Sequence, residues 1–210
     1  MNKKILLAGS GLLILILFFF CQGPKVNNWE ISKPESPFKQ IIFFGDSLTS
    51  GYGLNDDNES FPTLIGKNLN LPIKIYGYPG NTTADGLKKL PRLKDEKPSL
   101  LILTLGGNDI LHRAALEDTE SHLKSIISQL QSWGHTVVYT EVLSIMDGKR
   151  HLMHTNLCRE RKVCMVPDIL SGMITDQKLM QADSIHPNKD GCKLIAQRII
   201  KVLKEKKFFN

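Results

Sequence analysis

Short, unbroken apolar runs alternate with amphipathic segments along this chain, and this alternation limits the possible folds most strongly. The run at residues 100–105 is nearly continuous, as is typical of a strand that is buried on both faces of a parallel sheet. Similar runs predict strands at residues 41–44, 73–76, 100–105, 136–142 and 163–166. Helical patterns lie between them, at residues 60–70, 117–133, 150–161 and 188–204, with a short helix between Thr82 and Pro91.

Strands that alternate with helices form right-handed βαβ units, in which helices cover both faces of a parallel sheet. A chain of 210 residues is long enough for one domain with a full core, and short for two. The sequence therefore predicts an α/β fold: a three-layer α/β/α sandwich with a five-stranded parallel sheet.

The N-terminus has the pattern of a targeting segment. Asn2-Lys3-Lys4 is a short cationic region, and an apolar run at residues 5–20 follows it, as in a signal peptide. Cys21 comes directly after this run and resembles the acylated cysteine of a bacterial lipobox. We expect an exported, membrane-anchored lipoprotein of a bacterial cell envelope, with lipidation at Cys21. An uncleaved anchor and a simple cleaved signal remain open.

These patterns divide the chain into three parts. Residues 1–21 form the signal peptide with its lipobox-like cysteine. Residues 22–39 are polar and contain several prolines, which indicates a tether. Residues 40–210 form the predicted globular domain.

Charge gives little support to a nucleic-acid partner. The formal net charge is +6, but part of this excess lies in the targeting segment and much of the rest in the last helical turns. Basic residues near a helix C-terminus are favoured by the helix dipole. No basic patch interleaved with aromatic residues appears, so we expect no nucleic acid as partner.

The remaining cysteines and two histidines allow two further sites, which we do not favour. Cys158 and Cys164 are near enough in sequence for a disulfide, but both, like Cys192, lie in apolar or amphipathic surroundings that favour buried thiols. His151, His154 and Cys158 share a helical face, yet their spacing matches no recognised zinc pattern. We expect no metal.

Short motifs follow three of the predicted strands. Ser47 comes after the first, Gly80 after the second and Asn108 after the third, while Asp183 and His186 precede the last helix. Carboxyl ends of parallel strands meet at one edge of a sheet, where ligands bind. Residues that are far apart in the sequence can therefore share one cleft, which is the arrangement that acyl transfer needs.

In that chemistry each residue has a distinct role. Ser47 is the nucleophile, His186 the general base, and Asp183 the acid that orients the imidazole. The backbone N–H groups of Ser47 and Gly80 and the side-chain amide of Asn108 are the candidate oxyanion donors.

The same residues resemble the conserved blocks of the GDSL, or SGNH, hydrolases. These blocks are Gly45-Asp46-Ser47-Leu48, Gly80, Gly107-Asn108-Asp109 and Asp183-Ser184-Ile185-His186-Pro187. The segment from Gly80 to Pro91 is similar to the arylesterase and acyl-CoA thioesterase/lysophospholipase branch, although Asn81 stands where that branch commonly has Asp. The resemblance implies a flavodoxin-like fold and an enzyme that uses neither a metal nor an organic cofactor.

We therefore expect a serine ester hydrolase that acts on small acyl esters, thioesters or lysophospholipids. A carbohydrate O-acetylesterase and a surface-binding lipoprotein on a hydrolase scaffold are the alternatives.

Among the other polar residues, Asp46 and Asp109 are expected to brace their turns. We expect His122 on the solvent face of its helix, and His112 either at the pocket or on the surface.

Overall fold

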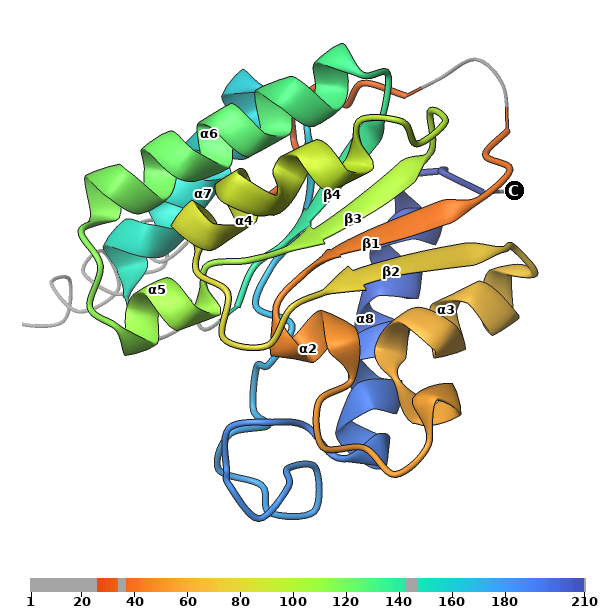
Figure 1. Ribbon diagram of the computed structural model, residues 1–210, viewed down its shortest axis with the longest axis vertical. Helices are drawn as coiled ribbons and strands as arrows, with labels where there is room; N and C mark the ends of the chain where they lie inside the picture. The colour runs from red at the N-terminus through yellow and green to blue at the C-terminus, as the bar shows by residue number, and fades with distance from the viewer. Residues whose placement is uncertain (1–25, 34–36, 143–146, 210) are drawn as a thin grey trace, which may run out of the picture.

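The computed structural model describes residues 26–33, 37–142 and 147–209, and in these residues a five-stranded parallel sheet forms the centre of the molecule (Figure 1). Its strands are β1 (Ile41–Gly45), β2 (Ile73–Gly77), β3 (Leu100–Thr104), β4 (Thr136–Thr140) and β5 (Cys164–Val166). The spatial order is β2-β1-β3-β4-β5. This is the flavodoxin-like order of doubly wound sheets, so the predicted fold class is confirmed.

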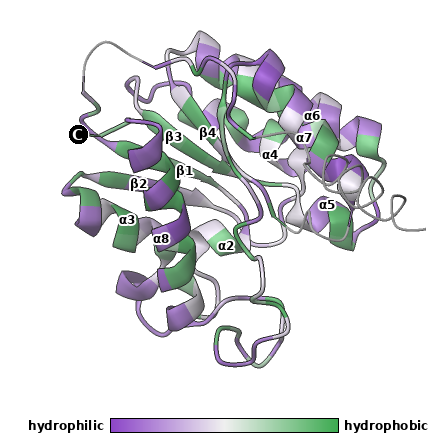
Figure 2. Cartoon of the chain, turned by 180° about the vertical axis from the view of Figure 1, so that it is seen from behind, coloured by the Kyte–Doolittle hydropathy of each residue, from purple (hydrophilic) through white to green (hydrophobic). Residues whose placement is uncertain are grey.

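Helices cover both faces of the sheet, which gives the three expected layers. One face is covered by α3 (Phe61–Leu69) and α8 (Lys189–Glu205). The other is covered by α4 (Thr83–Lys89), α6 (Leu116–Ser132) and α7 (Gly148–Glu160). Figure 2 shows the strands as a mostly hydrophobic layer behind α3 and α8, whose surfaces mix hydrophobic and hydrophilic residues.

The two faces of the sheet have separate hydrophobic cores because successive strand residues point in opposite directions. Phe43 and Ile102 belong to the core beneath α3 and α8. Phe44 and Leu103 belong to the core beneath α4, α6 and α7. Every residue of β1 and β3 is buried. The strand ends, and the polar residues that follow them, are therefore held firmly in place.

Four short helical segments were not among the predicted elements. Two of them, α2 (Ser47–Ser50) and α5 (Gly107–Leu111), follow β1 and β3 and carry residues of the predicted site. The other two are 3-10 turns, η1 (Asp57–Glu59) and η2 (Leu90–Leu93). The structure replaces the expected turns after β1 and β3 with one-turn helices.

Part of the expected tether is packed against the domain. The side chain of Asn27 donates a hydrogen bond to the carbonyl of Met165 (2.7 Å) and accepts one from the Met165 N–H (2.8 Å). Trp29 Nε1 donates to the carbonyl of Val163 (3.0 Å). Residues 26–33 are thus not a free linker, because they hydrogen-bond along β5.

Cys21 and the apolar run before it lie outside the described residues. Among the residues that are described, no helix combines the length and apolar character needed to cross a bilayer.

Cys158, Cys164 and Cys192 are buried free thiols, which agrees with the interpretation of these cysteines as small core residues. Burial raises the pKa of each of the three thiols.

Candidate active site

Ser47 is the first residue of α2, directly beyond the carboxyl end of β1. Asp46 caps this helix, and its Oδ1 accepts a hydrogen bond from the N–H of Leu48 (2.9 Å). Gly45 permits the close approach of the end of β1 to β3, because a Cβ there would lie 2.3 Å from the carbonyl oxygen of Thr104. The local sequence Gly-Asp-Ser thus fixes the serine at the edge of the sheet.

His186 and Asp183 form a hydrogen-bonded chain with this serine. His186 Nε2 lies 2.9 Å from Ser47 Oγ, and His186 Nδ1 lies 2.6 Å from Asp183 Oδ2. The other oxygen of Asp183 accepts hydrogen bonds from the N–H groups of Ile185 (2.9 Å) and His186 (3.0 Å). The hydrogen bond from the His186 side chain, followed by the backbone ones, lowers the pKa of Asp183 to about 2. Asp183 is therefore a carboxylate at neutral pH.

Tyr52 contacts the imidazole of His186, which the sequence did not indicate. The centres of the two rings lie 4.9 Å apart. The carbonyl of Tyr52 accepts a hydrogen bond from Gln181 Nε2 (2.8 Å), and this bond ties the Gly-rich loop after α2 to the loop that carries Asp183. Tyr52 therefore limits the movement of the imidazole from one side.

Gly80 lies in a tight turn after β2. The turn Tyr78-Pro79-Gly80-Asn81 is closed by a hydrogen bond from the N–H of Asn81 to the carbonyl of Tyr78 (3.1 Å). Proline at the second position and a glycine with φ of +78° at the third are typical of a type II turn. The N–H of Tyr78 donates to the carbonyl of Gly45 (3.0 Å), so the turn is attached to the end of β1.

Asn108 is on α5 and faces this turn. Its Nδ2 donates to the carbonyl of Asn81 (2.9 Å) and lies 3.5 Å from Asp46 Oδ2. The second contact is long and weak by hydrogen-bond criteria. An amide nitrogen carries two N–H groups, so one of them is available to a ligand oxygen.

The two expected bracing aspartates occupy buried positions beside these turns. Asp46 is only 2% exposed, and desolvation raises its pKa to about 7. The hydrogen bond from the Leu48 N–H acts in the opposite direction and lowers the pKa, but its effect is smaller. Asp109 accepts hydrogen bonds from the N–H and the hydroxyl of Thr83. Asp109 thereby links α5 to the start of α4, as expected of a bracing residue.

The candidate residues line one cavity of about 440 Å³. Ser47, Gly80, Asn108 and His186 all border it, whereas Asp183 lies behind the imidazole. Most of the other lining residues are hydrophobic: Leu48, Tyr52, Pro79, Leu111, Val142, Leu170 and Ile185. These hydrophobic residues were missed by the sequence analysis, because they come from separate loops and share no periodicity.

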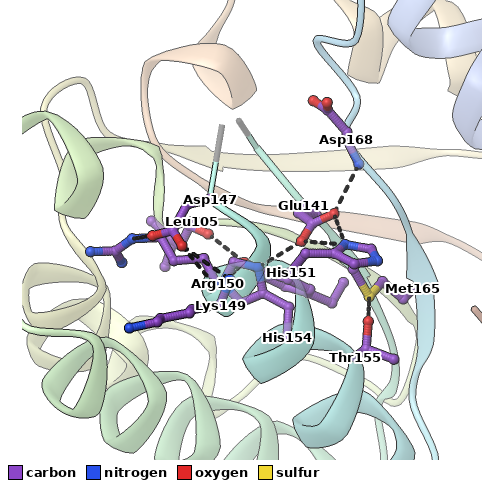
Figure 3. A network of polar contacts seen from close by, with 11 residues as sticks. Leu105, Glu141, Asp147, Lys149, Arg150, His151, His154, Thr155, Met165 and Asp168 are labelled. Atoms are coloured by element: carbon purple, nitrogen blue, oxygen red, sulfur yellow. Dashed lines mark hydrogen bonds and ion pairs between the residues drawn. The ribbon is translucent and has the colours of Figure 1, made fainter. Parts of the chain in front are cut away.

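The remaining histidines lie away from the cavity wall. His112 is exposed and does not line the cavity, so its surface alternative is the correct one. His122 was expected on the solvent face of α6, but it is half-buried, with its Nδ1 3.3 Å from the Thr83 hydroxyl. His151 and His154 do share a face of α7, where both contact Glu141 (Figure 3). Within the described ranges no cluster of three or more His, Cys, Asp or Glu side chains is arranged to hold a metal ion.

This arrangement has the distances required for nucleophilic catalysis. A hydroxyl, an imidazole and a carboxylate lie in hydrogen-bond contact at one end of an open, largely hydrophobic cavity. Two further polar groups, the Gly80 backbone and the Asn108 amide, border the same space. The set can attack a carbonyl carbon and stabilise the negative oxygen that results.

Comparison with known proteins agrees with this geometry. The profile of the "GDSL-like Lipase/Acylhydrolase family" matches residues 43–194. An arylesterase of Vibrio mimicus is 27% identical over 207 residues, which cover 91% of this chain and 98% of the relative. The "Thioesterase 1/protease 1/lysophospholipase L1" of Escherichia coli is 27% identical over 172 residues, which cover 78% of this chain and 82% of the relative. The crystal structure of TesA superimposes with a TM-score of 0.71 at 26% identity, covering 79% of this chain and 98% of that one.

Proposed function

Because the chain belongs to the GDSL-like lipase/acylhydrolase family and is a carboxylic ester hydrolase, we propose that it cleaves acyl esters through Ser47, His186 and Asp183. The observation that carries the proposal is the continuous contact from Ser47 Oγ through the imidazole to the Asp183 carboxylate. The substrates we propose are small acyl esters, thioesters and lysophospholipids.

The reaction proceeds in two acyl-transfer steps. His186 Nε2 takes the proton of Ser47 as Oγ attacks the carbonyl carbon, and Asp183 stabilises the imidazolium that forms. The imidazolium then gives its proton to the departing alcohol or thiol, which leaves an acyl-enzyme. A water molecule then attacks the acyl carbon while the same imidazole takes its proton. The bond from the acyl carbon to Ser47 Oγ breaks, the imidazolium returns the proton to Oγ, and the carboxylic acid leaves.

The negative oxygen of each tetrahedral intermediate is stabilised by three donors. These are the backbone N–H groups of Ser47 and Gly80 and the side-chain amide of Asn108. Loss of one donor of this kind commonly costs about 3 kcal/mol of transition-state stabilisation. The hydrophobic lining of the cavity favours the acyl part of an ester.

A membrane anchor is the second part of the proposal. The apolar run that ends at Cys21 supports lipidation of that cysteine and export of the chain as an envelope lipoprotein. Metabolic labelling with a radioactive fatty acid tests this, and Cys21→Ser is expected to abolish the label and release the protein from the membrane fraction. Label that persists in Cys21→Ser would refute lipidation at this residue.

Substitution of the nucleophile tests the catalytic proposal. Ser47→Ala is expected to lower turnover of a p-nitrophenyl ester by at least about 10³-fold, since no other group in the site can form the acyl-enzyme. A fluorophosphonate probe is expected to label the wild-type protein and not Ser47→Ala. Unchanged turnover in Ser47→Ala would refute the proposal.

A panel of substrates separates the alternatives. Hydrolysis of octanoyl esters and lysophospholipids is expected because of the hydrophobic cavity. Activity restricted to acetyl esters of carbohydrates would favour an O-acetylesterase. Folded wild-type protein that the fluorophosphonate does not label would favour a binding protein on a hydrolase scaffold.

A further inference from the structure

A buried polar network joins the end of β4 to α7 and takes no part in the reaction described above. At its centre is Glu141, fully buried directly after β4. Its two carboxylate oxygens lie 2.9 Å from His154 Nδ1 and 3.0 Å from His151 Nδ1 (Figure 3). A third contact comes from the N–H of Asp168 (3.2 Å). A buried carboxylate is stable only when it is paired in this way.

His154 connects this network to the turn before α5. Its Nε2 lies 3.2 Å from the hydroxyl of Tyr139, which donates a hydrogen bond to the carbonyl of Leu105 (3.0 Å). Tyrosine has one hydroxyl proton, so the Tyr139 oxygen accepts a hydrogen bond from His154. Nδ1 of the same ring faces the Glu141 carboxylate, so His154 joins Glu141 to Tyr139 and, through the Tyr139 hydroxyl, to Leu105.

Arg150 makes the matching contact at the other end of α5. Its Nη2 donates to the carbonyl of Ala114 (2.9 Å), just beyond the loop that ends α5. Arg150 is itself 9% exposed and lies one helical turn before His154. Its Nε lies 3.3 Å from Asp147, the residue that caps α7. The guanidinium is therefore held through Nη2 and Nε, whereas its Nη1 is buried and has no hydrogen-bond partner among the described residues.

Helix α5 depends on such support because it is very short. It has five residues, and a helix of that length is not stable by itself. Asn108 lies within it, and its own side chain makes one good contact, to Asn81. The flanking carbonyls of Leu105 and Ala114 are held by Tyr139 and Arg150, and the contact of Tyr139 with His154 leads back to α7.

We propose that Arg150 and His154 are positioning residues for the oxyanion donor Asn108, with Tyr139 as the link between His154 and Leu105. Helix α7 holds both ends of α5 through them, and so sets the distance of the Asn108 amide from the carbonyl that Ser47 attacks. This inference rests on the proposed function. An error of about 1 Å in the position of a catalytic group costs on the order of 10²-fold in rate.

Two single substitutions release the two ends of α5. Tyr139→Phe removes only the hydroxyl, so it breaks the link to His154 without unpairing Glu141. Arg150→Met removes the contact with Ala114 and keeps most of the side-chain volume. Each is expected to lower kcat about 10-fold and to change KM less than twofold, because the oxyanion donors act mainly on the transition state. Rates are expressed per active site, counted by fluorophosphonate titration.

Thr155→Val is the matched control. Thr155 is fully buried on α7 next to His154, but its hydroxyl lies against the sulfur of Met165 (4.0 Å). This variant is expected to change the stability of α7 and to leave kcat per active site within twofold of the wild-type value. A 10-fold loss in Thr155→Val would show that any disturbance of α7 lowers the rate, and would overturn the specific role of Arg150 and His154.

A double-mutant cycle with Asn108→Ala decides whether the contacts act through Asn108. Asn108→Ala alone is expected to lower kcat about 100-fold. In that background Tyr139→Phe and Arg150→Met are expected to cost less than twofold more. Equal losses in both backgrounds, or no loss in either, would overturn the inference. Full activity of Asn108→Ala would instead refute the oxyanion role in the proposed function, and the inference with it.

The cycle remains informative if Arg150→Met does not fold. Tyr139→Phe keeps the buried ring and removes one hydroxyl, so it tests the His154 end of α5 alone. Arg150→Lys, which retains the charge and loses the planar donor group, is then the variant for the other end. It is expected to keep kcat between the values of the wild type and of Tyr139→Phe.

Discussion

Asp46 is the residue at which stability and catalysis make opposite demands. Its carboxyl group caps α2 through Leu48 and so holds Ser47, yet burial makes its ionised form costly. The pKa of about 7 in the folded protein compares with 3.8 for the free side chain. The other oxygen of the same carboxyl group lies 3.5 Å from Nδ2 of Asn108, where it can accept a hydrogen bond from the proposed oxyanion donor.

Replacement of Asp46 by Asn is expected to change how stability depends on pH. Between about pH 4 and pH 7 the folded protein holds a proton on Asp46 and the unfolded chain does not, so wild-type stability falls as the pH rises through this window. The full penalty above pH 7 is at most about 4 kcal/mol. Asp46→Asn is expected to lose this fall, as measured by urea unfolding at pH 4 and pH 8.

Two comparisons make that experiment decisive. Asp56→Asn is the control, because the Asp56 carboxylate accepts from Asn58 in the same way but is exposed. If Asp46→Asn and the wild-type protein lose the same stability between pH 4 and pH 8, the carboxyl of Asp46 is not the group responsible. In Asp46→Asn the new side chain can place an amide nitrogen, which is a donor, opposite the Nδ2 donor of Asn108. We therefore expect kcat to fall in this variant although its fold is more stable.

At the scale of elements, the approach of β1 to its neighbours depends on glycine at position 45. Gly45→Ala places a Cβ 2.3 Å from the carbonyl oxygen of Thr104, so we expect a loss of about 3 kcal/mol or more in the free energy of unfolding. Gly148→Ala is the matched variant. An added Cβ at Gly148, in the first turn of α7, meets no atom of the described residues within 4 Å. There we expect a gain of about 0.5–1 kcal/mol.

Thermal and urea unfolding of both glycine variants test this expectation. A stable Gly45→Ala protein with wild-type activity would mean that β1 and β3 can separate without cost to the site. Equal destabilisation by the two variants would also contradict the prediction, since only one of the two sites is crowded.

The long elements were predictable from sequence, and the short ones were not. Apolar runs identified the five strands, and repeated apolar stripes identified the long helices α6 and α8. The shorter α4 was predicted from a threonine cap and the proline at its end. Helices α2 and α5 have four and five residues, too few for a period to appear. Their caps, Asp46 and Gly106, are visible only in the structure.

The same distinction applies to the site. Ser47, Gly80, Asn108 and His186 could be placed together because the carboxyl ends of parallel strands share one edge. The role of α7 could not be foreseen. The shared face of His151 and His154 was evident from their spacing, but their partner, Glu141, follows β4. Contacts between side chains of different elements depend on packing, which no local pattern records.

At the scale of the whole molecule, residues 26–33 protect an edge of the sheet. β5 is the last strand in the order, and its outer backbone groups need partners, because exposed edges promote pairing with other chains. Asn27 lies beside Met165, and the N–H of Ser32 donates to the carbonyl of Lys162 (2.9 Å), so this segment runs antiparallel to β5. The chain that leads to the proposed anchor is thus attached to the domain along β5.

Asn27 is the main contact of this segment, and its loss is expected to weaken the whole domain. The side chain pairs with both the N–H and the carbonyl of Met165, and Asn27 is 7% exposed. Asn27→Ala leaves both Met165 groups without these partners, so we expect a loss of about 3 kcal/mol in urea unfolding. Asn58→Ala is the control, because that side chain also makes two or more hydrogen bonds but on the exposed surface. There we expect a change of less than about 0.5 kcal/mol. Equal, small effects of the two variants would mean that residues 26–33 do not hold the edge of β5 in solution.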